Sequence, residues 1–151
     1  MAPLPSCFVC PCTITRFLLK HWQYGFGARY NPDRHRALSS IRLSESISAV
    51  INDITEHCGK SPKIIATSAK PSRTMWGYAE MRREISAGNT PYLLLFGTGW
   101  GLTDDTMMSA DYVLRPVYGA DDYNHLSVRS AVSIILDRLF GEGGAKFSQK
   151  F

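Results

Sequence analysis

Five consecutive apolar residues, Tyr92 to Phe96, restrict the possible folds of this chain more than any other segment. A strand with one exposed face alternates apolar and polar side chains, whereas a central strand of a parallel sheet is covered on both faces and reads as one apolar run. A glycine loop, Gly97 to Gly101, follows the run directly. We therefore predict a central strand of a parallel sheet that ends in a loop, the place where open α/β proteins bind their ligands.

Strand and helix patterns alternate along most of the chain, which is typical of a parallel sheet with crossover helices. Apolar spacing, caps and stop signals predict helices over residues 13–24, 32–38, 44–58, 74–87, 103–109 and 125–140, and strands over residues 41–43, 63–67, 92–96 and 112–114. Asn124 is the expected N-cap of the last helix and Gly141 its expected C′ stop, and Gly59 is the expected left-handed stop of the helix over 44–58. The predicted fold class is α/β, with a parallel sheet and helices on both of its faces.

The length of 151 residues predicts one domain. We expect this domain to cover residues 13–141, between an irregular leader at 1–12 and a flexible tail at 142–151. The formal net charge of +4 and the pI of about 9.0 permit a nucleic-acid partner but do not establish one.

The leader carries three cysteines, Cys7, Cys10 and Cys12. A structural zinc site needs a fourth ligand, usually from a second Cys or His pair, so we predict no metal. The leader also lacks the order of a signal peptide, in which basic residues precede an apolar core. No apolar run approaches the ~20 residues needed to span a bilayer, so we expect no membrane partner and a cytoplasmic protein.

The glycine loop fits neither common nucleotide-binding pattern. A dinucleotide fingerprint has the spacing G-x-G-x-x-G and an acidic residue at the end of the next strand. Here the spacing is G-x-G-x-G, and the next strand ends in Arg115-Pro116. A P-loop requires a Lys-Ser or Lys-Thr pair, and none follows. The loop instead offers main-chain groups that a ligand can approach closely, because glycine has no Cβ. A tight turn without a ligand is the alternative explanation.

Polar and basic residues gather at the expected start of the last helix, namely Tyr123, Asn124, His125 and Arg129. The unpaired N–H groups and the dipole of a helix N-terminus favour anionic or hydrogen-bonding ligands. This grouping predicts a ligand there, although a lone histidine such as His125 is more often structural than catalytic.

Two long motifs of this chain, FGTGWGL at 96–102 and DYNHLSVRSA at 122–131, resemble those of the SPOUT class of RNA methyltransferases. LRPV at 114–117, GARYNPDR at 27–34 and ATSAK at 66–70 extend the resemblance, which covers roughly residues 21–141. It is closer to a bacterial subfamily of predicted RNA methyltransferases, related to the C-terminal part of the tRNA guanine methyltransferases.

The resemblance implies a C-terminal trefoil knot, a homodimer formed through the knots, and an S-adenosylmethionine pocket built by three loops. These loops map onto residues 67–69, 96–102 and 114–131. The cofactor-binding residues that it implies are Thr67, Ser68, Phe96, Gly97, Thr98, Gly99, Gly101, Leu114, Pro116, Asn124, His125, Leu126, Ser127 and Ala131.

The predicted activity is S-adenosylmethionine-dependent transfer of a methyl group to a base or a ribose of tRNA or rRNA. His125 or the pair Asp121 and Asp122 would deprotonate the acceptor. Four residues are candidates for phosphate contacts or for an ordinary solvated surface: Arg29, Arg34, His35 and Arg36.

The chain departs from the resemblance at its start. Related chains begin with a further strand and a helix that carries an Asn…Arg motif, and no such motif precedes Thr13. We therefore expect an N-terminal strand and helix to be missing, with Arg129, His125 and Arg115 as the candidate catalytic residues. The alternative is a catalytically impaired, knotted dimer that binds S-adenosylmethionine or RNA without turnover.

Overall fold

The computed structural model describes residues 7–9, 13–71, 74–119 and 124–141. The chain divides into two compact units, and the division falls between His57 and Cys58. The length alone suggests a single domain over 13–141, but the contacts of the chain separate the first helices from the main sheet.

The first unit contains a short two-stranded parallel sheet. Strand β1 (Cys7–Val9) pairs with β2 (Ile41–Leu43), with Cys7 opposite Ile41 and Val9 opposite Leu43. Cys7–Val9 therefore form a strand in a stretch for which we expected irregular structure. Three residues are too few to show a strand period, so only the partner strand reveals this element. Cys10 and Cys12 lie outside the described residues.

The described residues of the first unit also form the helices α1 (Thr13–Tyr24), α2 (Phe26–Tyr30), α3 (Pro32–Ser39) and α4 (Ile47–Cys58). Asn31 caps α3, because its side-chain oxygen accepts a hydrogen bond from the Arg34 N–H at 2.9 Å, and Pro32 takes the first helical position. Gly59 follows α4 with φ of +68°, so the predicted left-handed stop is confirmed there.

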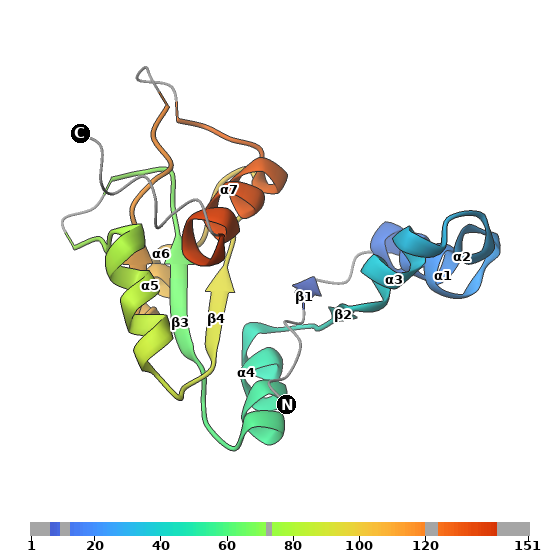
Figure 1. Ribbon diagram of the computed structural model, residues 1–151, viewed down its shortest axis with the longest axis horizontal. Helices are drawn as coiled ribbons and strands as arrows, with labels where there is room; N and C mark the ends of the chain where they lie inside the picture. The colour runs from blue at the N-terminus through green and yellow to red at the C-terminus, as the bar shows by residue number, and fades with distance from the viewer. Residues whose placement is uncertain (1–6, 10–12, 72–73, 120–123, 142–151) are drawn as a thin grey trace. The chain divides into compact units, whose positions relative to one another are not determined.

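The second unit is built on a three-stranded parallel sheet (Figure 1). Its strands are β3 (Lys63–Thr67), β4 (Tyr92–Leu95) and β5 (Tyr112–Leu114), in the order β4-β3-β5. The prediction that Tyr92–Phe96 is the central strand is therefore wrong for this sheet, because β3 takes the central place. An apolar run reports that both faces of a strand are covered, and it carries no information on strand order.

Helices α5 (Tyr78–Ala87) and α7 (Val128–Phe140) pack against each other and against the sheet, while α6 (Asp104–Ser109) contacts β3 (Figure 1). The core joins side chains from β3, α5, β5 and α7: Ile65, Met81, Tyr112, Leu114, Ile135 and Leu139. A parallel sheet with crossover helices is thus confirmed. Among the helices of the described residues, none combines the length and the apolar character needed to cross a membrane.

Three helices begin three or four residues later than the sequence predicts, namely α4, α5 and α7. Before α5, Trp76 extends the edge of the sheet: its N–H donates to the Val113 carbonyl at 2.8 Å, and its carbonyl accepts from the Arg115 N–H at 3.0 Å. Before α7, the N-cap is Ser127 and not Asn124, because the Ser127 hydroxyl accepts from the Ser130 N–H at 3.3 Å. Gly141 follows the last residue of α7, so the predicted stop is confirmed there, and its φ is −73°.

Candidate functional site

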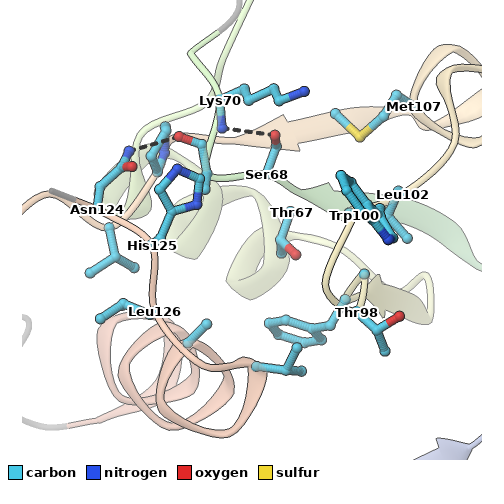
Figure 2. Close-up of a pocket in the computed structure, with 18 of the residues that line it drawn as sticks. Thr67, Ser68, Lys70, Thr98, Trp100, Leu102, Met107, Asn124, His125 and Leu126 are labelled. Carbon is cyan, nitrogen blue, oxygen red and sulfur yellow. Dashed lines mark hydrogen bonds between the residues drawn. The ribbon is translucent and has the colours of Figure 1, made fainter.

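The loops at the carboxyl ends of β3, β4 and β5 surround one cavity of about 430 Å³ (Figure 2). The loop after β3 contributes residues 67–71, the glycine loop after β4 contributes 96–102, and the loop after β5 contributes 115–117. The segment 124–126 and the first turns of α7 close the remaining side. The volume lies within the ~300–1,000 Å³ of typical ligand pockets.

The glycine loop turns back on itself so tightly that two of its positions need glycine. A Cβ at Gly97 would lie 2.3 Å from the Gly101 carbonyl carbon and 2.5 Å from the Leu102 nitrogen. Gly101 has φ of +86°, and its N–H donates to the Thr98 carbonyl at 2.5 Å. Gly99, in contrast, has open space at the position of its missing Cβ. The tight turn and the open approach for a ligand are therefore properties of different glycines in one loop.

Asn124 joins the segment before α7 to the loop after β3. Its amide nitrogen Nδ2 donates to the Ala69 carbonyl at 2.7 Å, which Figure 2 shows as a dashed line. In the same loop, the Lys70 N–H donates to the Ser68 hydroxyl at 3.0 Å. Asn124 therefore holds two walls of the cavity together, which replaces the helix-capping role that we predicted for it.

The loop after β5 is held by Tyr78. The Tyr78 hydroxyl donates to the Arg115 carbonyl at 2.8 Å, and burial raises the pKa of Tyr78. Pro116 is buried, while the Arg115 side chain is exposed at the rim of the cavity. The backbone of this loop is thus held by the Tyr78 hydroxyl, and its residues Arg115 and Pro116 contribute to the cavity lining.

The walls combine apolar side chains with main-chain groups and a few charges. Apolar contributions come from Phe96, Leu102, Met107, Pro116, Val117, Leu126, Val128, Ala131 and Ile135. Charged side chains are Lys70, Asp104 and Arg115. Such a lining suits a ligand with a flat apolar part and a polar edge, because the apolar walls hold the first and the loop backbones can bond the second.

All but two of the predicted cofactor-binding residues line this cavity. The lining members are Thr67, Ser68, Phe96, Gly97, Thr98, Gly99, Gly101, Pro116, Asn124, His125, Leu126 and Ala131. Leu114 does not, because its side chain is fully buried in the core, and Ser127 does not, because its hydroxyl caps α7. The structure therefore brings together residues that are up to 64 positions apart in the sequence, from Thr67 to Ala131.

Of the three candidate catalytic residues, two line the cavity and one does not. His125 and Arg115 line the cavity, and Figure 2 shows His125 between the loop after β3 and the start of α7. Arg129 does not line it and is exposed in the first turn of α7. The predicted ligand site at Tyr123 and the candidate bases Asp121 and Asp122 lie outside the described residues.

Five lining residues lie outside the three predicted loop segments: Lys70, Pro71, Asp104, Met107 and Ile135. Asp104 and Met107 belong to α6, which the sequence presents only as a short connection between two strands. Ile135 shares the apolar face of α7 with residues of the core, so periodicity alone assigns it to packing. Lys70 is the last residue of the ATSAK motif and Pro71 follows it directly, which was the one available signal for these two loop residues.

The sequence matches a family model described as SAM-dependent RNA methyltransferase over residues 12–141. An uncharacterized protein of Aquifex aeolicus (strain VF5) is 41% identical over 122 residues, which cover 81% of this chain and 60% of that protein. A tRNA (guanine-N(1)-)-methyltransferase of Oleidesulfovibrio alaskensis is 43% identical over 125 residues, which cover 83% of this chain and 29% of that protein. The matched part of this chain thus spans 60% of the length of the first relative and 29% of that of the second.

The fold is shared by the solved structure of a probable methylase family protein from Haemophilus influenzae Rd KW20, among others. The TM-score is 0.54 at 21% sequence identity, and the match covers 79% of this chain and 53% of the other. The family match covers nearly all of both described units, including every segment that lines the cavity. This chain belongs to the SAM-dependent RNA methyltransferase family.

Proposed function

We propose that the cavity binds S-adenosylmethionine and that the chain transfers its methyl group to a base or a ribose of tRNA or rRNA. The observation that carries the proposal is the convergence of three loops on one cavity at the carboxyl ends of β3, β4 and β5. Family membership supports the same ligand, and the tRNA methyltransferase relatives support tRNA as the acceptor.

The lining fits the proposed ligand in shape and chemistry. Adenine is flat and apolar on its faces but carries hydrogen-bonding groups on its edge, so it needs apolar walls and main-chain partners. Leu102, Val117 and Leu126 provide such walls, and the glycine loop exposes its backbone at Gly99. Lys70 and Asp104 place one positive and one negative charge on the lining, which suits the carboxylate and the ammonium of the methionine part.

The bound sulfonium supplies an activated methyl group, so the protein has to position the acceptor and remove its proton. His125 lies on the lining and is our candidate for taking that proton. Arg115, exposed at the rim, is our candidate for holding the RNA backbone near the cavity. Arg129 remains a proposed catalytic residue if the acceptor approaches along the first turn of α7.

We further propose the trefoil knot and the homodimer of the SPOUT class. Two observations support the knot: the connection from β4 to β5 crosses the central strand β3, and the segment at Asn124 then returns to the loop after β3. The exposed apolar side chains Leu136 and Phe140 of α7 support a partner subunit, because large apolar groups in water favour burial. We place the enzyme with its RNA in the cytoplasm.

Two assays on the full chain test the proposal together. Calorimetry with S-adenosylmethionine measures binding, and transfer of a labelled methyl group to bulk tRNA and rRNA measures activity. We expect saturable binding and label in RNA. Binding without transfer would contradict the enzymatic part and leave a binding protein, and the absence of both would overturn the proposal.

A further inference from the structure

The positive charge of the chain is concentrated in one segment. Residues 13–43 contain six basic residues and one acidic residue, whereas the remainder contains eleven basic and twelve acidic residues. The net charge of the whole protein therefore originates from the part that forms α1, α2, α3 and β2. A concentration of charge of this kind attracts polyanions.

The same segment exposes large aromatic rings. Tyr24, Phe26 and Tyr30 are 83%, 72% and 75% exposed. Phe26 and Tyr30, one helical turn apart on α2, stack on each other with centroids 6.0 Å apart and an interplanar angle of 24°. Exposing large aromatic rings to water costs free energy that burial against a partner recovers, and a stacked pair offers flat faces to such a partner.

Helices α1, α2 and α3 contact one another in the segment that carries this stack (Figure 1). A Cβ at Gly27 would lie 2.6 Å from the Trp22 ring, so α2 rests directly on that ring. The Arg34 guanidinium of α3 lies 4.5 Å from the centre of the Trp22 ring, and the Gln23 amide donates to the Leu38 carbonyl at 2.7 Å. Trp22 thus joins α1, α2 and α3, which gives the stacked rings a defined position.

Basic residues lie close to the stacked rings in the sequence. Arg29 precedes Tyr30 in α2, and Arg34 and Arg36 follow on α3, which contacts α2. Within the part of the chain that the structure describes, neither Arg29 nor Arg36 forms an ion pair, whereas Arg42 forms a bidentate pair with Asp53 at 2.5 and 2.6 Å. The charges of Arg29 and Arg36 are therefore available to an external anion.

We propose that these residues form an aromatic–basic surface, consisting of Tyr24, Phe26, Arg29, Tyr30, Arg34 and Arg36, that binds an unpaired segment of RNA. Unpaired bases stack on exposed aromatic rings, and the phosphates between them pair with arginines. Paired bases have no free faces for such stacking, so a duplex gains only the charge contacts. This inference rests on the proposed function, which makes RNA the methylation substrate. It adds the surface on which that substrate is held.

An anionic membrane surface is the alternative partner for a surface of aromatic rings and arginines. The structure favours RNA over a membrane. Helix α3 has no buried residue and places Asp33 among its arginines, so it presents a polar surface and not an apolar face for lipid. Insertion into the interface of a bilayer requires a broad apolar face along a helix.

The test measures the affinity of the full chain for a fluorescent single-stranded RNA of about 12 nucleotides, within the ~4–16-nucleotide sites of such surfaces. Phe26→Leu and Tyr30→Leu remove a flat ring but keep an apolar side chain, and we expect each to weaken binding about 10-fold, in line with measured base–aromatic stacking. Phe26→Tyr and Tyr30→Phe keep the ring and are expected to bind as the parent chain does.

The arginines are tested through salt dependence. Each phosphate contact to single-stranded RNA contributes about 0.7 to the slope of log affinity against log salt, so Arg29→Gln and Arg36→Gln should each lower the slope by about that amount. Arg42→Gln is the matched control, because its charge is already paired with Asp53, and we expect a smaller change.

Three results would overturn the proposal. The leucine and aromatic variants could have equal affinity for RNA, or the parent chain could have equal affinity for single-stranded RNA and its duplex. The third is that the leucine variants lose binding to anionic phosphatidylserine vesicles but keep their affinity for RNA. Calorimetry with S-adenosylmethionine on the same variants separates the two proposals, since none of these residues lines the cavity. Unchanged cofactor affinity with weakened RNA binding supports the surface even if no methyl transfer is found. Normal transfer with unchanged RNA affinity rejects the surface alone.

Discussion

At the scale of single residues, Gly97 tests whether the geometry of the glycine loop matters for ligand binding. Gly97→Ala introduces a Cβ that would collide with the backbone at Gly101 and Leu102, so the loop has to open. We expect at least a 10-fold weaker affinity for S-adenosylmethionine by calorimetry, equivalent to about 1.4 kcal/mol. Gly77→Ala is the control, because a Cβ at Gly77 meets no atom within 4 Å and Gly77 does not line the cavity. Equal affinity of both variants would contradict this role of Gly97.

A second residue-scale prediction concerns Glu84, at the opposite end of the sheet from the cavity. Its carboxylate accepts hydrogen bonds from the Tyr112 hydroxyl at 2.8 Å and from Lys63 Nζ at 3.3 Å, and these bonds lower the pKa of Glu84. A lowered pKa in the folded state means that the stabilisation is complete above the unfolded-state pKa and is lost as the pH falls through the folded-state pKa. Both charged side chains are partly exposed, so solvent screens the pair and we expect a modest effect.

The measurement for Glu84 compares urea midpoints of the parent chain and Glu84→Gln. The parent chain should be more stable at neutral pH, and the difference should shrink once the pH falls below about 4.3, the usual pKa of a glutamate. A difference that is constant between neutral pH and pH of about 3 would show that the charge of Glu84 contributes nothing.

At the scale of elements, substitutions of Ser127 at the start of α7 test helix capping separately from ligand binding. Ser127→Ala removes the N-cap hydroxyl and should lower the free energy of unfolding by about 1 kcal/mol, whereas Ser127→Asp should preserve it. Urea unfolding measures both. Because Ser127 does not line the cavity, calorimetry should give the same cofactor affinity for all three chains. A loss of affinity without a loss of stability in Ser127→Ala would instead assign Ser127 to the ligand, as the resemblance implies.

Asn124 provides the complementary test, because it links two loops and caps no helix. Asn124→Asp keeps the size of the side chain but cannot donate to the Ala69 carbonyl at neutral pH. We expect the loops to separate and the affinity for S-adenosylmethionine to fall by about 3- to 10-fold, which corresponds to the loss of one hydrogen bond. The free energy of unfolding should change little. Unchanged affinity would mean that the link does not shape the cavity.

The elements also show what could be read from the sequence. Most helices and strands were predictable, because apolar periodicity, Pro32 and Gly59 report local conformation. The start of α7 was not, because Asn124 and Ser127 are both good caps and only the long-range bond of Asn124 to Ala69 decides between them. The central place of β3 was equally hidden, since strand order depends on crossovers that no local pattern encodes.

At the scale of the whole molecule, the two units have different chemical character. The unit that ends at His57 contains the basic segment and the exposed rings, and the unit that begins at Cys58 contains the cavity. The sequence motifs located most of the cavity lining, because the glycine loop and the polar loops follow strands directly. They did not reveal Asp104, Met107 or Ile135, whose places in the lining depend on how α6 and α7 pack.

The central claim is that the cavity at the carboxyl ends of β3, β4 and β5 is the methyl-donor site. Ultraviolet cross-linking of methyl-labelled S-adenosylmethionine to the full chain, followed by peptide mapping, tests it most directly. We predict saturable label on peptides from the lining segments, residues 67–71, 96–102, 115–117 and 124–131, and its competition by unlabelled ligand. Label confined to residues 17–57, or no saturable label on any peptide, would contradict the claim.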